Sequence, residues 1–422
     1  MTKHEEITVP QDSSLRTFSQ PSQLKITDMR TATVSGKHIL KIYTNQDIYG
    51  LGEIRDGAST TYALMLKSRI LGENPCDVDR LFRKIKQFGG HARQGGGVCA
   101  VEMALMDLTG KAYGVPAYQL AGGKFRDKIR IYCDTYPDPD PQEMSSKLQE
   151  RIDRGFTFLK MDIGIDLLRN TAGTLSAPSG MLDTLEIMHP FTGIQITDKG
   201  IDMLREYVGT VRETIGYDIP LAADHFGHLN VESCIRLARA LDQFSLAWLE
   251  DMIPWQFTDQ YVRLSKACET PICTGEDIYL KESFEILFEK GAISVCHPDL
   301  STSGGILETK KIGDLAQEHG IVMAMHNAGT PISTMANVHC AAATENFMAL
   351  ENHYVDIPSW NDIVTGLPNP IIQNGYISVP EEPGLGVDLN EATAREHLNE
   401  GDGFFEPTSE WDEANSWDRL WS

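Results

Sequence analysis

Short apolar runs that end in polar residues alternate with helical stretches from about residue 128 onward. The runs are IRIYCD, TFLKMD, IPLAAD, SLAWLE, PICTGE, AISVCH, IVMAMH and FMALE. Eight strands separated mainly by helix-sized intervals are what a (β/α) barrel of the α/β class requires. An open doubly wound sheet would also alternate in this way, so the periodicity leaves both architectures open. The polar residues that end the runs decide between them.

The segments on either side of these strands have a different pattern. The stretch from about Leu24 to Gly52 contains the β-like segments LKITDMRTATV, HILKIYT and IYGLGE, which favour a small antiparallel sheet. Apolar residues in VCAVEMALMDLTGKAYG then recur at helical spacing. We therefore predict an α+β unit over residues 1–127, the barrel over residues 128–370, and a return of residues 371–422 to the first unit, ending in an acidic tail.

One interval between strands is too long for a single helix. Between Asp162 and Ile219 the chain inserts LLRNTAGTLSAPSGMLDTLEIMHPFTGIQITDKG, which is rich in Gly, Ser, Thr and Pro. It follows the carboxyl end of a strand, where long loops are more often functional than idle.

Composition and charge exclude several kinds of partner. The 422-residue chain has a formal net charge of −23, so nucleic acid and anionic membranes would repel it. The start MTKHEEITVPQ has no apolar stretch of signal-peptide length, and no later run is long enough to span a membrane, so we expect a cytoplasmic protein. The eight cysteines are scattered without zinc spacing, and we expect them to be reduced and mostly buried.

Three successive strands of the predicted barrel end in carboxylates: Asp224, Glu250 and Glu276. They are 26 residues apart, which is one βα unit each. Neighbouring strands bring such residues together at the carboxyl-terminal mouth of a barrel. Carboxylate oxygens with room for water suit octahedral Mg²⁺, and without a cation their charges would repel one another. A single carboxylate of this kind would more often be an ordinary solvated residue, but three at equal spacing favour a metal site.

The following strands add residues typical of acid–base chemistry. Asp299 in CHPDL and His326 in MAMH predict a carboxylate that orients a general base. Glu351 could donate a proton to a substrate carboxylate if its neighbours kept it protonated; otherwise it is an ionised residue at the mouth. Lys160 and Asp162 are two apart on the second strand and so face the barrel interior together, which also fits an internal ion pair.

These residues resemble those of the mandelate racemase-like members of the enolase superfamily, over nearly the whole chain. The segments GVCAVEMALMDLTGKAYGVPAYQLAGGKFRDKIRIY and PGLGVDL are similar to that family's domain junction and return strand. The resemblance implies a modified TIM barrel, (β/α)7β, with an α+β capping domain built from the N- and C-terminal segments. It further implies one Mg²⁺ per subunit on the three carboxylates, a His326–Asp299 dyad, a metal-bound enediolate, a small carboxylate substrate and a homo-oligomer.

The chain departs from the family pattern on the second strand. Racemases of this branch have Lys-x-Lys there, whereas here the second position is Asp162. One-base chemistry through His326 fits better, which favours dehydration of a sugar acid to a 2-keto-3-deoxy acid. Asp162 could then act as a weak base, an acid or a counter-charge to Lys160. A cycloisomerase or epimerase acting on a sugar acid or its lactone remains the alternative, and a non-catalytic binding protein is a third hypothesis from a different class.

Three histidines and the insertion are candidates for substrate recognition. His225 and His228 follow the first predicted metal ligand, and His297 precedes Asp299 by two residues; each could contact a polyhydroxy substrate or only line the mouth. The capping hairpin TATVSGKHILKIYT is short, although relatives often have a long specificity loop there. We therefore hypothesise that the insertion around residues 167–200 supplies the lid.

Overall fold

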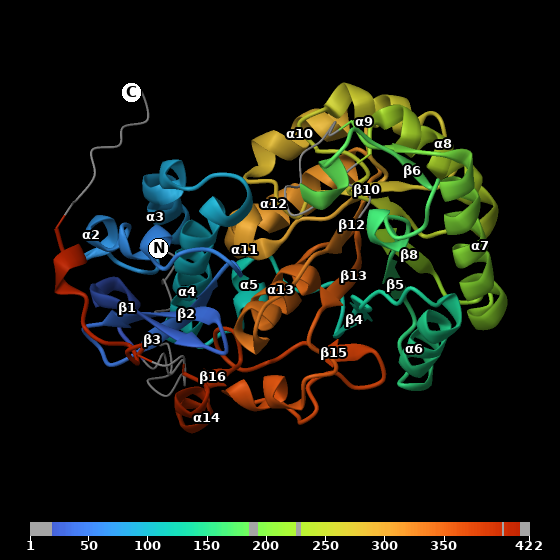
Figure 1. Ribbon diagram of the computed structural model, residues 1–422. Coiled ribbons are helices and arrows are strands. Elements are labelled where there is room, and N and C mark those ends of the chain that lie inside the picture. The colour runs from blue at the N-terminus through green and yellow to red at the C-terminus, as the bar shows by residue number, and fades with distance from the viewer. Residues whose placement is uncertain (1–18, 185–192, 225–228, 399–400, 414–422) are drawn as a thin grey trace, which may run out of the picture.

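The computed structural model describes residues 19–184, 193–224, 229–398 and 401–413, which form two lobes (Figure 1). The smaller lobe contains an antiparallel sheet of β1 (Ile26–Val34), β2 (Lys37–Thr44) and β3 (Tyr49–Ile54) in the order β1-β2-β3. Its helices are α1 (Thr61–Leu64), α2 (Lys67–Ile70), α3 (Val78–Ile85), α4 (Gly96–Tyr113) and α5 (Ala117–Leu120). The α+β unit predicted from the sequence is therefore present.

The sheet of this lobe packs very closely on helix α4. A Cβ atom on Gly50 or Gly52 of β3 would lie 2.0 Å from the carbonyl oxygen of Ala104 or Ala100, respectively. Only glycine permits this approach of a strand backbone to a helix backbone. The contact fixes β3, whose end faces the larger lobe.

The larger lobe is a barrel of eight parallel strands. They are β4 (Lys128–Cys133), β5 (Leu159–Asp162), β8 (Leu221–Asp224), β9 (Leu249–Glu250), β10 (Ile272–Thr274), β11 (Val295–Cys296), β12 (Val322–Met325) and β13 (Phe347–Asn352). The hydrogen-bonded order runs β4-β13-β12-β11-β10-β9-β8-β5, and β5 lies against β4 to close the circle. All eight predicted strands are confirmed.

Seven longer helices connect these strands within the described residues. They are α6 (Pro141–Asp153), α7 (Asp198–Ile215), α8 (Val231–Leu241), α9 (Thr258–Ser265), α10 (Lys281–Glu289), α12 (Gly305–Glu318) and α13 (Pro331–Ala343), with a short α11 (Leu300–Ser303) before α12. Single 3₁₀ turns occur at Pro21–Gln23, Lys86–Phe88, Ala92–Gly95, Ile165–Leu167, Met181–Thr184, Asp242–Phe244, Pro358–Ile363 and Ser409–Trp411. The predicted modified TIM barrel, (β/α)7β with a capping lobe, is confirmed.

One buried side chain from each strand, or from the residue just before it, fills the barrel interior. This buried cluster consists of Tyr132, Phe158, Ala222, Trp248, Cys273, Val295, Ala324 and Ala349. Large aromatic residues on one side meet small residues on the other, as a closed barrel requires. The polar residues of the mouth lie directly above this apolar layer.

After the barrel the chain returns to the capping lobe. Strand β15 (Tyr376–Ser378) pairs antiparallel with β4, so this part of the return extends the barrel sheet. β14 (Val364–Thr365), which precedes β15 in the chain, pairs with β16 (Asp388–Leu389), and helix α14 (Glu391–Glu396) follows β16. Beyond it, isolated bridges join Leu398 to Val34 and Phe404 to Ala32 of β1. In Figure 1 this red segment runs beside the blue sheet.

Part of the long insertion also has a defined structure. Its two ends pair as a short antiparallel ladder of β6 (Leu175–Ser176) and β7 (Gln195–Ile196). Residues 185–192, in the middle of the segment that we hypothesise to be a lid, lie outside the described residues. The lid therefore stays a prediction.

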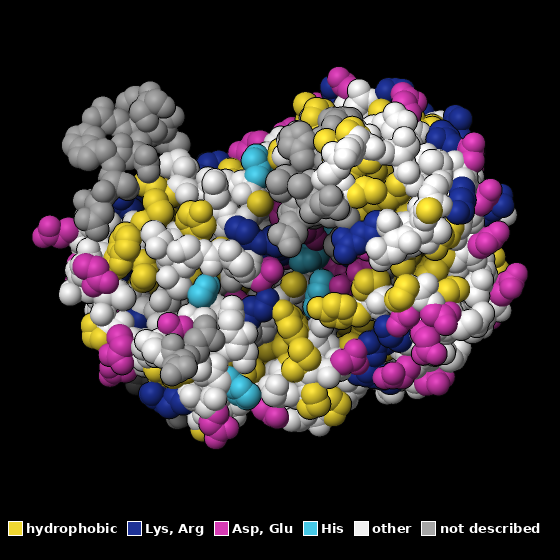
Figure 2. Space-filling model, viewed as in Figure 1, with side chains coloured by type: hydrophobic (Ala, Val, Ile, Leu, Met, Phe, Trp, Pro, Cys, Tyr) yellow, Lys and Arg dark blue, Asp and Glu magenta, His cyan; other side chains and the backbone are white. Residues whose placement is uncertain are grey.

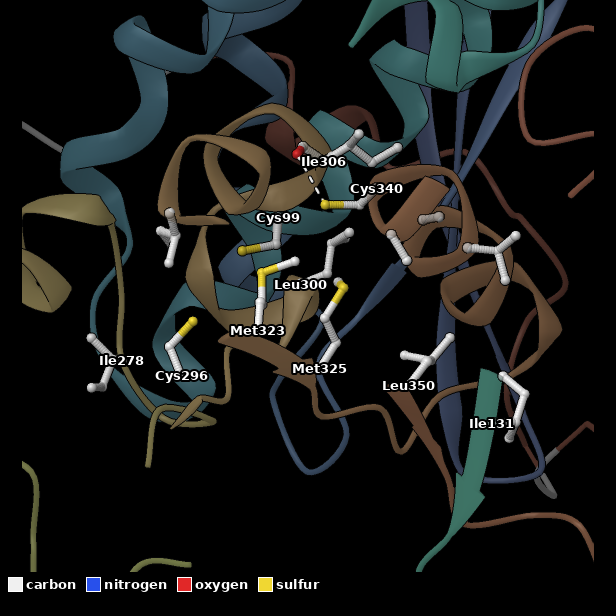
Figure 3. Packing of buried hydrophobic residues seen from close by; sticks show 14 of the residues in the cluster. Cys99, Ile131, Ile278, Cys296, Leu300, Ile306, Met323, Met325, Cys340 and Leu350 are labelled. Carbon is white, nitrogen blue, oxygen red and sulfur yellow. Dashed lines mark hydrogen bonds between the residues drawn. The ribbon is translucent and has the colours of Figure 1, made fainter. Parts of the chain in front are cut away.

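The two lobes share one apolar core. Figure 3 shows Cys99 of α4 packed near Leu300 of α11 and Met323 of β12, with Cys340 of α13 donating to the Ile306 carbonyl. All eight cysteines are free, and six of them are buried. Among the described residues, no helix has the length and apolar character needed to cross a bilayer.

Two buried carboxylates of the capping lobe fix its position on the barrel. Glu102 of α4 accepts hydrogen bonds from the backbone N–H groups of Ile306 (2.6 Å) and Leu307 (3.0 Å), at the start of α12. Glu53 of β3 accepts from the N–H and hydroxyl groups of Thr330, at the start of α13. Carboxylates at helix N-termini satisfy unpaired donors and the positive end of the dipole. The end of β3 is thus held over the barrel mouth.

Candidate active site

Carboxylates from three adjacent strands gather at the carboxyl-terminal mouth of the barrel. Asp224 ends β8, Glu250 ends β9 and Glu276 lies just beyond β10. Ligand oxygens of Asp224, Glu250 and Asp251 lie within 4.8 Å of one another. Burial, with the charges of Asp224 and Glu250 among its neighbours, raises the pKa of Glu276 to about 7. The structure therefore brings the three predicted metal residues to one mouth and adds a fourth carboxylate, Asp251.

Asp251 reaches this cluster through an unusual backbone conformation. Its φ is 45°, in the left-handed region, and its Oδ1 accepts a hydrogen bond of 2.5 Å from the Thr274 hydroxyl. Burial and the neighbouring charges of Glu276 and Glu250 raise its pKa well above the ordinary value. Negative charges this close together and shielded from water repel one another, so a bound cation would stabilise them.

Lys160 of β5 supplies one positive charge to the cluster. Its Nζ lies 2.7 Å from Asp224 Oδ2, 3.1 Å from Glu250 Oε1 and 2.8 Å from Glu351 Oε1. Burial opposes the charge, but these three carboxylates hold the pKa of Lys160 well above its ordinary value. The ammonium is therefore charged and engaged in ion pairs with Asp224, Glu250 and Glu351, whereas the internal ion pair considered from the sequence was with Asp162.

His297, which follows β11, lies beneath the carboxylates. Its ring is fully buried, its Nδ1 donates to the Ala324 carbonyl oxygen at 3.0 Å, and its Nε2 lies 3.1 Å from Glu250 and 3.3 Å from Glu351. Burial opposes protonation, but the two carboxylates raise the pKa of His297 well above its ordinary value. In this structure His297 supports the carboxylates, and its contact with a substrate stays a prediction.

The predicted dyad forms between two adjacent strands. Asp299 and His326 are joined by a parallel β-bridge, and Asp299 Oδ2 lies 2.6 Å from His326 Nδ1. His326 Nε2 lies 3.1 Å from Glu276 Oε2. Burial and the charge of Arg55 lower the pKa of His326 well below its ordinary value. A neutral imidazole with Nδ1–H directed at a carboxylate leaves Nε2 to accept a proton at the mouth.

Arg55 is a site residue that the sequence did not reveal. It follows β3 of the capping lobe, is 2% exposed, and its guanidinium contacts Asp299 and lies 2.9 Å from His326 Nδ1. It also lies 3.6 Å from Glu276 Oε1. Asp299 therefore accepts from both a guanidinium and an imidazole, and the capping lobe completes the dyad. No local motif marks this arginine, because its partner His326 is 271 positions away.

Glu351 would have to be protonated to act as a proton donor, and its neighbours oppose this. Burial alone would raise the pKa of Glu351, but the Lys160 ammonium and the His297 imidazole hold it well below its ordinary value. Of the two alternatives that the sequence left open for Glu351, this environment favours the ionised carboxylate. Asp162 ends β5 opposite Asp224 in the parallel ladder and is partly exposed, so it lies at the same mouth. His225 and His228 lie outside the described residues.

A hollow between the two lobes leads to these residues. Figure 2 shows histidine (cyan) and acidic (magenta) side chains at its bottom. A cavity of about 490 Å³ beside the carboxylates is lined by His91 from the capping lobe and by Asp251, Trp255 and Asp277 from the barrel. A space of this size suits a small organic acid.

The donor set fits a hard divalent cation. The carboxylates of Asp224, Glu250 and Asp251, at the ends of β8 and β9, offer oxygen atoms, which suit Mg²⁺ better than zinc. Two further groups of potential ligands are Glu250, Cys273 and His297, and His326, Glu351 and His353. Both groups include nitrogen or sulfur donors, which suit transition metals better than Mg²⁺.

Comparison with known proteins gives consistent matches along the chain. Residues 143–393 match the family model "Enolase C-terminal domain-like", and residues 6–122 match "Mandelate racemase / muconate lactonizing enzyme, N-terminal domain". The chain is 34% identical to a D-xylonate dehydratase of Haloferax volcanii, over 90% of this chain and 91% of that protein. It is 27% identical to a D-galactonate dehydratase of Verminephrobacter eiseniae, over 88% and 94%.

A solved structure also resembles the whole fold. A mandelate racemase/muconate lactonizing enzyme-like protein from Rubrobacter xylanophilus superimposes with a TM-score of 0.79 at 32% identity. The match covers 90% of this chain and 99% of that one. Both lobes are therefore part of the shared architecture.

Proposed function

Because the chain belongs to the mandelate racemase/muconate lactonizing enzyme family of the enolase superfamily and is a carbon–oxygen lyase, we propose that it dehydrates a sugar acid to a 2-keto-3-deoxy acid. The observation that carries the proposal is the His326–Asp299 dyad beside a cluster of carboxylates at the barrel mouth. A base and a cation site side by side are what abstraction of a proton next to a carboxylate requires. Aldonic acids such as D-xylonate and D-galactonate, the substrates in the relatives' names, are the substrate class that we propose.

Asp224, Glu250 and Glu276 would hold one Mg²⁺, with Asp251 beside them. When bound, the cation would supply positive charge that stabilises the enolic intermediate formed after loss of the α-proton. The Lys160 ammonium already contacts Asp224, Glu250 and Glu351, and it would hold these three side chains in place as the substrate carboxylate enters.

His326 Nε2 would remove the α-proton. Asp299 holds the ring in the Nδ1–H tautomer, so the resulting imidazolium is stabilised by an adjacent carboxylate. Arg55 contacts Asp299 and fixes its orientation. The capping lobe and the barrel must therefore be assembled together for the base to function.

The test is an incubation in D₂O with Mg²⁺ and a panel of aldonic acids that includes D-xylonate and D-galactonate. We expect a 2-keto-3-deoxy product from at least one acid, and a loss of at least about 10²-fold in kcat for His326→Asn. His319→Asn is the matched control, because His319 is exposed and lies between the end of α12 and the start of β12, whereas His326 follows the other end of β12. An isomeric product without loss of water would instead support the cycloisomerase or epimerase alternative. Metal binding without any proton exchange would refute catalysis.

Homo-oligomerisation and a cytoplasmic location stay predictions. They accord with the relatives' role as enzymes of small acids but do not bear on the chemistry at the mouth.

A further inference from the structure

A second histidine–carboxylate pair lies at the mouth beside the dyad. Asp134 directly follows β4, and His353 directly follows β13; these strands pair in parallel with Asn352 opposite Cys133. His353 Nδ1 lies 3.2 Å from Asp134 Oδ2. The arrangement repeats that of Asp299 and His326, in which a carboxylate at one strand end orients an imidazole at the next.

The other ring nitrogen of His353 faces the site. Its Nε2 lies 3.7 Å from Glu351 Oε1 and makes no hydrogen bond within the described part of the chain. The rings of His353 and His326 are 5.4 Å apart between centroids, at an interplanar angle of 63°. An enclosed ring nitrogen without a partner is costly unless a ligand completes it. The nitrogen is therefore available to a substrate that His326 also reaches.

We propose that His353 is the general acid that protonates the departing β-hydroxyl group, with Asp134 as its positioning residue. This inference rests on the proposed dehydratase function. Nδ1 of His353 lies against Asp134, so Nε2 is the ring nitrogen left facing the site, beside Glu351.

The step balances as follows in atoms and electrons. His326 takes the α-proton, and the electron pair of that C–H bond becomes the double bond between the α- and β-carbons. The β-carbon–oxygen bond breaks, its electron pair leaves with the oxygen, and the Nε2 proton of His353 converts the hydroxyl to water. The enol product then becomes the 2-keto acid by loss of its enol O–H proton to water and protonation at the β-carbon, and both histidines return to their starting states by proton exchange with water.

The neighbouring alternatives for this acid are less suitable in the structure. The Lys160 ammonium is committed to three carboxylates, and the ionised Glu351 has no proton to give. His326 could return its own proton to the leaving group, and this single-histidine route is the alternative that the experiment must separate.

The experiment compares wild type with His353→Gln in D₂O, using Mg²⁺ and the aldonic acid that wild type turns over. Deuterium incorporation at the α-carbon and 2-keto product are measured separately by NMR. In His353→Gln we expect product formation to fall by at least about 10²-fold relative to wild type. We expect α-deuterium exchange by His326 to continue within a few-fold of the wild-type rate. Product formation close to wild type, or equal loss of exchange and product, would overturn the proposal. If wild type itself forms no product, the proposed function fails instead.

A substrate with a better leaving group provides a second measurement. A 3-deoxy-3-fluoro analogue loses fluoride, which needs no proton from the enzyme. His353→Gln should release fluoride within a few-fold of the wild-type rate, whereas a general structural defect would slow both substrates equally and overturn the assignment. Asp134→Asn should lower kcat on the hydroxy acid by roughly tenfold with KM nearly unchanged. His319→Gln is the matched control, and equal thermal unfolding temperatures confirm that the variants are folded.

Discussion

Replacement of Arg55 by Met tests whether the capping lobe takes part in the chemistry. The guanidinium contacts Asp299, lies 3.3 Å from Asp56 and 3.6 Å from Glu276, and is 2% exposed. Methionine would fill much of the same space without the charge. Among the described residues, the carboxylate of Asp299, itself 2% exposed, would then keep only the Ser301 N–H and the His326 ring as partners.

The expected effect on stability follows from this burial. Removing one partner of a buried ion pair typically costs about 3–5 kcal/mol, because the other charge stays buried without compensation. We expect a decrease of this size in the free energy of unfolding measured in urea. Since Arg55 also fixes the orientation of the dyad, we expect kcat to fall by roughly 10–100-fold, as is typical when outer partners of catalytic ligands are removed.

Arg93→Met is the matched control for this variant. The Arg93 side chain is 39% exposed and lies near Asp56 and Asp277, which are also 3.3 and 3.8 Å from Arg55, but it contacts neither Asp299 nor His326. Its replacement should change stability by less than about 1 kcal/mol, as for other exposed ion pairs. If Arg55→Met and Arg93→Met have equal effects on kcat, the reasoning that couples the capping lobe to the dyad is refuted.

Three further predictions follow from buried charges. Lys160→Met should destabilise the protein by about 3–5 kcal/mol and should make its unfolding temperature rise more on addition of Mg²⁺ than that of wild type; an equal rise would contradict the cation's role. Burial raises the pKa of Glu102 from 4.5 to about 7. As the pH rises from 4.5 to 7 the unfolded chain loses this proton before the folded protein does, so the free energy of unfolding should decrease over this range. Urea unfolding of Glu102→Gln should lack this part of the pH dependence. Glu276→Gln should weaken Mg²⁺ binding, measured by calorimetry, more than Asp251→Asn does, and the reverse order would make Asp251 the third ligand.

The strand ends at the barrel mouth could be predicted from the sequence because they follow a local rule. Each buried strand ends where its apolar run ends, and neighbouring strands in a barrel are neighbours in sequence. Asp224, Glu250 and His326 therefore needed only the spacing of the runs. The capping sheet and the helix at Gly96–Tyr113 followed equally from local periodicity.

The residues that the sequence did not reveal depend on geometry that no local pattern contains. Arg55 comes from the other lobe, and only the packing of β3 on α4 places it over the dyad. Asp251 directly follows Glu250, so strand alternation would direct it away from the interior; its left-handed backbone turns it back. The ionised state of Glu351 depends on Lys160 and His297 together, which the sequence could not place within ion-pair distance.

The most direct test of the account is anomalous diffraction from crystals soaked in Mn²⁺ as a substitute for Mg²⁺. We predict one strong peak per subunit, within coordination distance of carboxylate oxygens of Asp224, Glu250 and Glu276. A peak instead at Glu250, Cys273 and His297, or at His326, Glu351 and His353, would contradict the proposed metal site. The absence of any peak at the mouth would remove the charge on which proton abstraction depends.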